Sequence, residues 1–367
     1  MNKQQIPVVV LAGFLGSGKT TLLNHLLHRS GGSRIGAIVN DFGSIEIDAM
    51  SVAGQLGDST VSLGNGCLCC AVDASELDEY LDRLARPAAG IDVIVIEASG
   101  LAEPQELVKM LLASENPHIV YGGLVEVVDA AEFSATRERH PEVDRHLGIA
   151  DLVVVNKADR VPAEERERVV RAVRGLAGRA AVVAASYGRV DVELFFDRAP
   201  VGERVGQLSF DDLREDDHDL REDGHSETEA CADGRCAHHD HLHAAYESLA
   251  FTSEVPMAPR PLMALLDSRP EGLYRIKGYV DFGAADPRNR YEVHAVGRFL
   301  RFYPEPWAPG EPRLTQLVLI GSGVDVSTLE KELEACREYA PQADEQGMWG
   351  VLRYVREPDE ESGSPME

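Results

Sequence analysis

The segment 7–27 reads PVVVLAGFLGSGKTTLLNHLL, and it decides the fold of the chain. An apolar, β-branched run ends at Gly13, a glycine-rich loop closes with Gly18, Lys19 and Thr20, and leucines at helical spacing follow. A strand, such a loop and a helix in this order are typical of a P-loop, whose backbone N–H groups surround phosphate oxygens. The segment therefore predicts a site for a nucleoside triphosphate.

The residue types of this loop indicate what its side chains do. We expect Lys19 to bring a cation to the β- and γ-phosphates and the Thr20 hydroxyl to ligate Mg²⁺, so that both stabilise charge during catalysis. The following helix adds the positive end of its dipole to the same anion site. The residues of this segment expected to contact the nucleotide are Gly13, Gly16, Ser17, Gly18, Lys19, Thr20 and Thr21.

A second apolar run, IDVIVIE at 91–97, is typical of a buried strand that carries a carboxylate at its end. This is the Walker B arrangement, in which we expect Glu97 to ligate or orient Mg²⁺ and Gly100 to meet the γ-phosphate. Another expected strand, at 34–40, runs into a polar turn that contains Asp41. Because hydrolysis is a phosphoryl transfer, we expect Asp41 or Glu97 to position the attacking water.

The base is predicted by the sequence NKAD, which follows the expected strand 151–155. A carboxylate at Asp159 can accept hydrogen bonds from the N1 and N2 donors of guanine, Asn156 can hold the base and the loop, and the stem of Lys157 can lie against the ring. Adenine lacks this donor pair, so a carboxylate in the same place would be left without partners. The motif therefore favours GTP over ATP.

Three thiols lie within four residues at Cys67, Cys69 and Cys70, and they follow Gly64-Asn65-Gly66. Closely spaced thiolates bring several soft ligands to one ion without any long-range folding requirement. The alternative, cysteines packed in a core strand, fits poorly with the flanking glycines and asparagine. The cluster predicts a transition-metal site.

Size and charge set limits on the class of protein. A chain of 367 residues exceeds one comfortable core, so two domains are expected. A formal net charge of −26 argues against nucleic acid or an anionic membrane as the main partner, because both are polyanions. The first residues carry no apolar signal segment and no run approaches membrane-spanning length, so we expect a cytoplasmic protein with reduced cysteines.

The pattern of elements predicts an α/β fold with a P-loop domain built on a mostly parallel sheet, followed by a small α+β domain. The second domain is expected to contain strands at 273–282, 291–302 and 313–320. The predicted divisions are a P-loop GTPase domain at 1–200, an acidic His-rich linker at 201–244, the α+β domain at 245–357 and a flexible tail at 358–367.

The linker is dense in Asp, Glu and His, and six of the chain's 12 histidines fall between His218 and His243. Little in it can build a core. Its histidines could bind or relay metal loosely, whereas a plain solvated acidic linker is the alternative, because nothing in the sequence fixes a ligand geometry. The candidate auxiliary ligands are His238, His239, His241 and His243.

The chain resembles the CobW-like P-loop GTPases through four motifs in one order: Gly13–Thr20, Cys67–Cys70, Glu97–Gly100 and Asn156–Asp159. That family includes the cobalamin-biosynthesis protein CobW, zinc-responsive metallochaperones and activators of nitrile hydratase, and it is related to the nickel chaperones HypB and UreG. The likeness extends to Leu101–Pro104, to the His-rich linker and to Gly272–Gly278, so it covers nearly the whole chain. Ala98 departs from the pattern, because many relatives carry a hydroxyl residue there.

The resemblance implies a GTP-hydrolysing metallochaperone in which Cys67, Cys69 and Cys70 bind a transition metal, with Glu46 or a water as an additional ligand. Zinc is the first expectation for the metal and cobalt the second, since a sulfur-rich site disfavours Mg²⁺ and Ca²⁺. We expect GTP with Mg²⁺ to order the loop 40–48 and tighten the thiolate site, and hydrolysis to release the metal to a client metalloprotein. A nucleotide-dependent homodimer is a further expectation, and intrinsic turnover should be slow because no arginine finger is evident.

Two other functions remain open at this stage. A metal buffer or sensor with incidental GTPase activity would bind several weak ions through the linker histidines and show no GTP dependence. A small-molecule kinase would need ATP preference and a phosphoacceptor pocket, and the segment Asn156–Asp159 argues against it.

Overall fold

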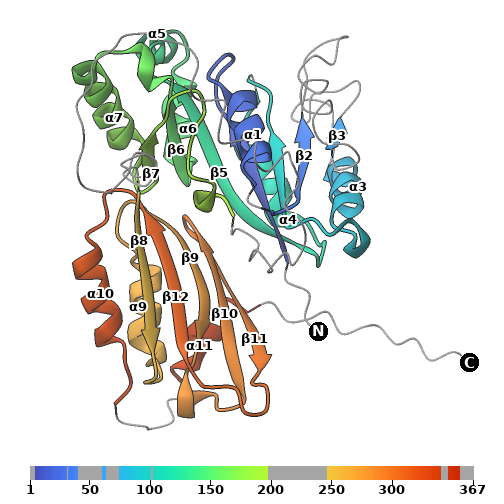
Figure 1. The fold of residues 1–367 in the computed structure, drawn as a ribbon, viewed down its shortest axis with the longest axis vertical. Coiled ribbons are helices and arrows are strands. Elements are labelled where there is room, and N and C mark those ends of the chain that lie inside the picture. Colours follow the sequence, from blue (N-terminus) through green and yellow to red (C-terminus); the bar gives the residue numbers. More distant parts are fainter. Residues whose placement is uncertain are drawn as a thin grey trace, which may run out of the picture.

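The computed structural model describes residues 5–30, 32–39, 60–62, 74–100, 102–196, 246–339 and 346–355. Two sheets organise these residues (Figure 1): a parallel sheet between helices, and below it an antiparallel sheet with helices of its own. The predicted fold class, a P-loop α/β unit followed by a small α+β unit, is confirmed. The predicted domain boundaries stay predictions.

The parallel sheet has β1 at its centre and the order β3-β2-β4-β1-β5-β6-β7 within the described residues. All of its neighbouring strands run parallel. Because parallel strands bring their carboxyl ends to one edge, the ends of β1, β4, β5 and β6 lie together at that edge of the sheet. The strands are β1 (Ile6–Ala12), β2 (Ile35–Val39), β3 (Thr60–Ser62), β4 (Val93–Glu97), β5 (Ile119–Asp129), β6 (Leu152–Asn156) and β7 (Ala181–Ala184).

Alternate residues of β1 serve two separate cores, as the period of a strand requires. Val9 and Leu11 pack in one cluster with leucines of α1, whereas Val8 and Val10 pack in another with leucines of α3 and α4. All four β1 residues are fully buried. A strand buried on both faces reads as a continuous apolar run, which is why the sequence pattern located it.

The helices of this unit cover both faces of the sheet (Figure 1). Helix α4 begins at Pro104, since proline is favoured in a first turn, where its missing N–H is not needed. No described helix is both long and apolar enough to cross a bilayer. The helices are α1 (Lys19–His28), α3 (Ala74–Leu84), α4 (Pro104–Ala113), α5 (Phe133–Arg139), α6 (Glu142–Ile149) and α7 (Ala163–Ala177).

The antiparallel sheet has the order β11-β10-β9-β12-β8. Its inner face shares one apolar cluster with three helices. The elements are β8 (Glu247–Ser253), α9 (Pro259–Asp267), β9 (Leu273–Val280), β10 (Asn289–Val296), β11 (Phe299–Pro306), β12 (Thr315–Gly321), α10 (Val326–Ala335) and α11 (Met348–Leu352).

The prediction of one strand at 291–302 is wrong, because this stretch folds as a hairpin. Val296 of β10 pairs with Phe299 of β11, and Gly297 and Arg298 form the turn. Gly297 has a φ of +53°, in the left-handed region that a tight turn requires. A single Gly-Arg pair between two apolar runs was too weak a turn signal to divide the run.

The hairpin turn is where the two sheets meet. The carboxylate of Asp151, just before β6, accepts from Tyr121 Oη at 2.6 Å and from the Leu124 N–H at 2.9 Å. A Cβ at Gly297 would overlap Asp151 Oδ1, so only glycine allows this approach. The Gly297 N–H donates to the carbonyl of Tyr274 at 2.8 Å.

Further contacts join the two units. His294 Nε2 lies 2.9 Å from the Tyr121 carbonyl, and burial lowers the pKa of His294 to about 4, so the neutral ring donates this hydrogen bond. The hydroxyl of Ser322 donates to the Val182 carbonyl at 2.9 Å. Tyr274 and Val296 belong to the same buried cluster as the centre of the parallel sheet. The two units therefore share a core, not only a polar surface.

Substituting Gly297→Ala should destabilise the chain more than Gly310→Ala. Both glycines have positive φ, but a Cβ at Gly310 meets open space whereas one at Gly297 meets the Asp151 carboxylate. We expect about 1 kcal/mol of lost unfolding free energy at Gly310 from backbone strain, and about 2–4 kcal/mol at Gly297 because a buried hydrogen-bonded carboxylate must also move. Urea unfolding of both variants measures this, and equal losses would contradict the assigned contact.

Candidate nucleotide site

The P-loop, residues 13–20, joins the end of β1 to the start of α1. Gly18 has a φ of +103°, and a Cβ there would overlap the side-chain amide of Asn156. A Cβ at Gly13 would likewise overlap the Val127 carbonyl oxygen. Glycine at these two positions lets the loop pass close to the ends of β5 and β6.

Lys19 lies in the first turn of α1 with its ammonium folded back over the loop. Its Nζ donates to the carbonyl of Gly13 at 2.8 Å and to that of Phe14 at 3.3 Å, and the residue is buried. Thr21 follows two residues later in α1 and is exposed. The cation predicted for the phosphates is thus present inside the loop.

Thr20, in the first turn of α1, meets Glu97 at the end of β4. The Thr20 hydroxyl donates to Glu97 Oε1 at 2.7 Å, and Leu11 of β1 is in register with Glu97. A hydroxyl and a buried carboxylate at this edge are hard oxygen donors of the kind that Mg²⁺ prefers, so the residues fit this ion. The pairing joins two residues that the sequence singled out separately.

Gly100 lies against the outer side of the P-loop. A Cβ on Gly100 would come within 2.7 Å of the Leu15 backbone nitrogen, so glycine is needed for this close approach. The segment that follows Glu97 is therefore packed directly on the loop. A shift of either segment would therefore displace the other.

Asn156 ties the P-loop to two neighbouring segments. Its side-chain Nδ2 donates to the Ser17 carbonyl at 3.0 Å, and its Oδ1 accepts from the Gly188 N–H at 2.8 Å. The residue is only 1% exposed, so these hydrogen bonds form without competition from water. The role expected for Asn156, holding the loop, has a concrete geometry here.

Lys157 belongs to the NKAD segment 156–159, called the base loop from here on, and its side chain connects this loop to the P-loop. Its Nζ donates to the Gly16 carbonyl at 2.6 Å and pairs with Asp129 Oδ2 at 2.6 Å. Its stem therefore spans the space between the two loops. Asp159 follows in a short 3-10 turn, Ala158–Arg160, with an exposed side chain. An exposed carboxylate beside this stem is free to meet a base edge.

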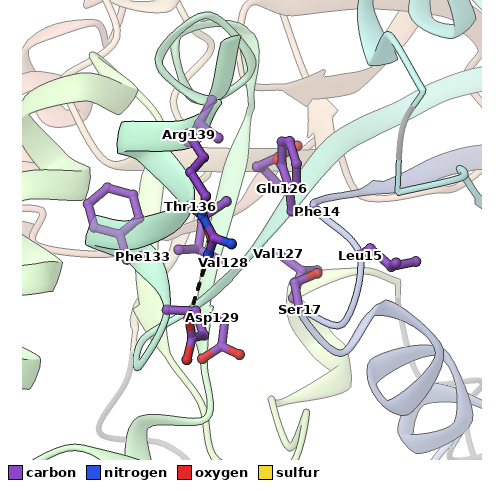
Figure 2. A pocket seen from close by; sticks show the side chains of 12 residues that line it. Phe14, Leu15, Ser17, Glu126, Val127, Val128, Asp129, Phe133, Thr136 and Arg139 are labelled. Atoms are coloured by element: carbon purple, nitrogen blue, oxygen red, sulfur yellow. Dashed lines mark ion pairs between the residues drawn. The ribbon is translucent and has the colours of Figure 1, made fainter. Parts of the chain in front are cut away.

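A pocket of about 200 Å³ lies between the P-loop, the end of β5 and α5. Figure 2 shows Phe14, Leu15 and Glu126 among the side chains that line this pocket. Glu126 is 2% exposed, and its Oε2 has no hydrogen-bond partner. Burial raises the pKa of Glu126 to about 8, while the positive charge of Lys19 opposes the shift. The carboxyl is therefore largely neutral at pH 7.

Several predicted site residues lie outside the described residues. These are the candidate water-positioning Asp41, the candidate metal ligand Glu46, the cysteines Cys67, Cys69 and Cys70, and the linker histidines His238, His239, His241 and His243. Within the described ranges, no group of three or more His, Cys, Asp or Glu side chains is arranged to hold a metal ion. The metal site stays a prediction.

Sequence comparisons identify related proteins. The profile of the CobW/HypB/UreG nucleotide-binding domain matches residues 7–184, and that of the cobalamin synthesis protein cobW C-terminal domain matches residues 246–337. The zinc chaperone CobW of Pseudomonas aeruginosa is 32% identical over an alignment that covers 90% of this chain and 91% of that protein. The chain belongs to the CobW family. A family profile thus matches each of the two units of this CobW-family protein.

Two further curated relatives match a smaller part of this chain, and a solved structure aligns with most of it. The zinc chaperone YjiA of Escherichia coli is 31% identical over 52% of this chain and 61% of its own length. The zinc-regulated GTPase metalloprotein activator 1 of Schizosaccharomyces pombe is 28% identical over 64% of this chain and 57% of its own length. The crystal structure of Zn(II)-bound YjiA GTPase from E. coli aligns with 91% of the CobW-family chain at 21% identity and a TM-score of 0.40.

Asp129, Glu126 and Gly188 were not predicted as site residues. Asp129 ends an apolar strand, which is the same signal that located Glu97, so it could have been found. Glu126 is a single charge within the apolar run of β5, and such an interruption is a signal of a buried ionisable group. Gly188 carries no local signal, because its contact with Asn156 joins residues that are 32 positions apart.

Replacing Glu126 by glutamine should alter how stability depends on pH. A carboxyl whose pKa is raised in the folded state binds more protons there than in the unfolded chain, so the wild type loses stability as pH rises from about 5 to about 8. Glu126→Gln cannot titrate, so its unfolding free energy should gain on the wild type by up to about 1.4 kcal/mol per pH unit. Urea unfolding at pH 5, 6, 7 and 8 measures the difference.

The control for this experiment is Glu164→Gln, which changes an exposed carboxylate in the first turn of α7. It should lower the unfolding free energy by about 0.3–1 kcal/mol, because it removes a negative charge at the positive end of the α7 dipole, and this difference should stay constant from pH 5 to pH 8. Parallel pH profiles for Glu126→Gln and the wild type would show that the buried carboxyl is already ionised in the folded chain, against the environment described above.

Proposed function

We propose that this chain is a GTP-hydrolysing metallochaperone that binds a transition metal at Cys67, Cys69 and Cys70 and delivers it to a client protein. The observation that carries the proposal is the direct hydrogen bonding of the NKAD loop to the P-loop through Asn156 and Lys157. This contact supports one connected site in which the NKAD loop would select guanine and the P-loop would bind the phosphates. The CobW family membership adds the expectation of metal handling.

The chain is a GTPase of the CobW type, and its own residues supply the parts of a nucleotide site. We assign phosphate binding to the P-loop residues Gly13 to Thr21, and base recognition to Asn156, Lys157 and Asp159. When a nucleotide binds, the Lys19 ammonium would exchange its hydrogen bonds to the Gly13 and Phe14 carbonyls for one to a phosphate oxygen, because a charged acceptor is a stronger partner than a carbonyl.

Magnesium, when bound, would neutralise charge on the β- and γ-phosphates. Thr20 and Glu97 are the residues that would hold it, since their oxygens already meet at the edge of the sheet. Gly100 packs on the P-loop, so we expect a γ-phosphate bound by this loop to change the position of the segment that follows Glu97. Either Glu97 or Asp41 would orient the attacking water.

The cargo is proposed to be zinc, with cobalt second. Thiolates suit both ions, and relatives of this chain carry the names zinc chaperone CobW and zinc chaperone YjiA. Glu46 is a candidate fourth ligand, and His238, His239, His241 and His243 are candidate auxiliary ligands. The released ion is handed to a client metalloprotein, in line with relatives named metalloprotein activators.

The working state is proposed to be a nucleotide-dependent homodimer in the cytoplasm, where a reducing environment keeps the three thiols available for metal. Domain divisions at 200, 244 and 357 complete the proposal. The His-rich segment 201–244 would connect the GTPase unit to the antiparallel unit.

Metal titration under three nucleotide conditions tests the proposal. Zinc is titrated into the wild type and into Cys67→Ser, Cys69→Ser and Cys70→Ser, each with a non-hydrolysable GTP analogue, with GDP and without nucleotide. We expect one tight site in the wild type that the analogue strengthens about 5- to 150-fold, the range of ordinary coupling between two sites. Each serine variant should lose the tight site.

Cys336→Ser serves as the matched control, because this buried thiol lies in the antiparallel unit and donates to the Glu332 carbonyl. It should bind zinc as the wild type does. Independent binding of zinc and nucleotide would contradict the chaperone. Loss of all zinc binding on deletion of residues 218–243 would instead favour a metal buffer.

A further inference from the structure

Tyr187 has an unusual backbone conformation for an aromatic residue. Its φ is +55°, and among the described residues only Tyr187 and Lys157 have positive φ without being glycine. Left-handed backbone disfavours a residue with a Cβ, and such strain persists where the surrounding structure imposes it, often at binding sites. Lys157 belongs to the candidate base loop, so the two strained residues invite comparison.

The loop that carries Tyr187 is bonded to the base loop. The Ala158 N–H donates to the Ala185 carbonyl at 3.0 Å, and the Gly188 N–H donates to Asn156 Oδ1 at 2.8 Å. Ser186 and Arg189 close the turn with a β-bridge. Tyr187 is therefore fixed at its two sides by hydrogen bonds to the residues that flank Lys157.

The same loop also touches the start of α1. A Cβ at Gly188 would come within 2.8 Å of the Leu22 nitrogen and 3.0 Å of the Thr21 carbonyl carbon. Tyr187 thus lies where the base loop and the first turn after the P-loop converge. This turn therefore adjoins both the NKAD loop and the first turn of α1, the two elements assigned to the base and the phosphates.

Packing does not explain the tyrosine. Its side chain is 65% exposed, so the ring contributes little to the core, and a glycine in its place would relieve the strained φ. An exposed ring held at a strained position beside the base loop is suited to a contact that forms only with a ligand.

We propose that Tyr187 binds the nucleobase, with its ring against one face of the guanine while the Lys157 stem lies on the other. This inference rests on the proposed function, because it names a residue of the same nucleotide site. Stacking has little preference among bases, so Tyr187 supplies affinity and Asp159 supplies the choice of guanine. The hydrogen-bonded turn fixes the backbone from which the ring projects, which lowers the entropy lost on binding.

The test compares ligands with and without a base. Calorimetry measures binding of Mg²⁺-GDP and of Mg²⁺-tripolyphosphate to the wild type, to Tyr187→Gly and to Tyr187→Phe. Glycine suits the positive φ, so Tyr187→Gly removes the ring without adding strain. Base stacking on an aromatic side chain predicts a 5- to 150-fold loss of GDP affinity in Tyr187→Gly, about the effect of one stacked base. Tyr187→Phe should bind GDP within about 3-fold of the wild type.

Tripolyphosphate should bind all three proteins equally, because it occupies the P-loop alone. Tyr339→Gly, which removes another exposed tyrosine in the antiparallel unit, should leave both affinities unchanged. GDP affinity unaltered in Tyr187→Gly, or an equal loss for GDP and tripolyphosphate, would overturn the proposal while leaving the proposed function in place. A wild type that fails to bind Mg²⁺-GDP would overturn both.

Discussion

The side chain of Asn156 joins three segments that surround the candidate nucleotide site. Its amide nitrogen holds the P-loop through Ser17 and its oxygen holds the turn after β7 through Gly188, while its own backbone ends β6. Because the amide is buried, each hydrogen bond must be made within the protein or left unmade at a cost of about 1–3 kcal/mol. The P-loop and the NKAD loop are consequently fixed relative to each other before any ligand binds.

Strand β5 connects this site to the second unit. At its start, the Tyr121 carbonyl accepts from His294 and the Tyr121 hydroxyl donates to Asp151; at its end, Asp129 pairs with Lys157 of the base loop. One continuous strand thus contacts both the antiparallel sheet and the nucleotide site.

The sequence predicted the parts of the site that depend on local pattern. The P-loop, the carboxylate that ends β4 and the NKAD loop each follow a buried apolar strand, and strand ends of a parallel sheet share one edge, so their meeting was foreseeable. The hydrogen bond between Thr20 and Glu97 follows from that rule. The order of the elements also predicted a P-loop unit with a mostly parallel sheet, followed by a small α+β unit.

Other features depend on tertiary contacts and could not be read from a pattern. The positive φ of Tyr187 arises because its neighbours bond to Asn156 and abut α1, and the raised pKa of Glu126 arises because its strand is covered on both sides. The hairpin at Gly297 was missed because two apolar runs separated by two residues resemble one long strand. The predicted roles of Asp41, Glu46 and the three clustered cysteines concern residues outside the described ranges.

The affinity of Asn156→Ala for Mg²⁺-GDP is the most direct test of the account. The variant loses both hydrogen bonds that join the loops, so we expect the chain to stay folded and GDP affinity to fall at least about 30-fold, since 1.4 kcal/mol corresponds to tenfold. Asn116→Ala is the control, because this asparagine is also buried but bonds Asp82 and His118 away from the P-loop, so the change should leave GDP affinity unchanged. Binding by Asn156→Ala within about 3-fold of the wild type would contradict the claim that this side chain organises the site.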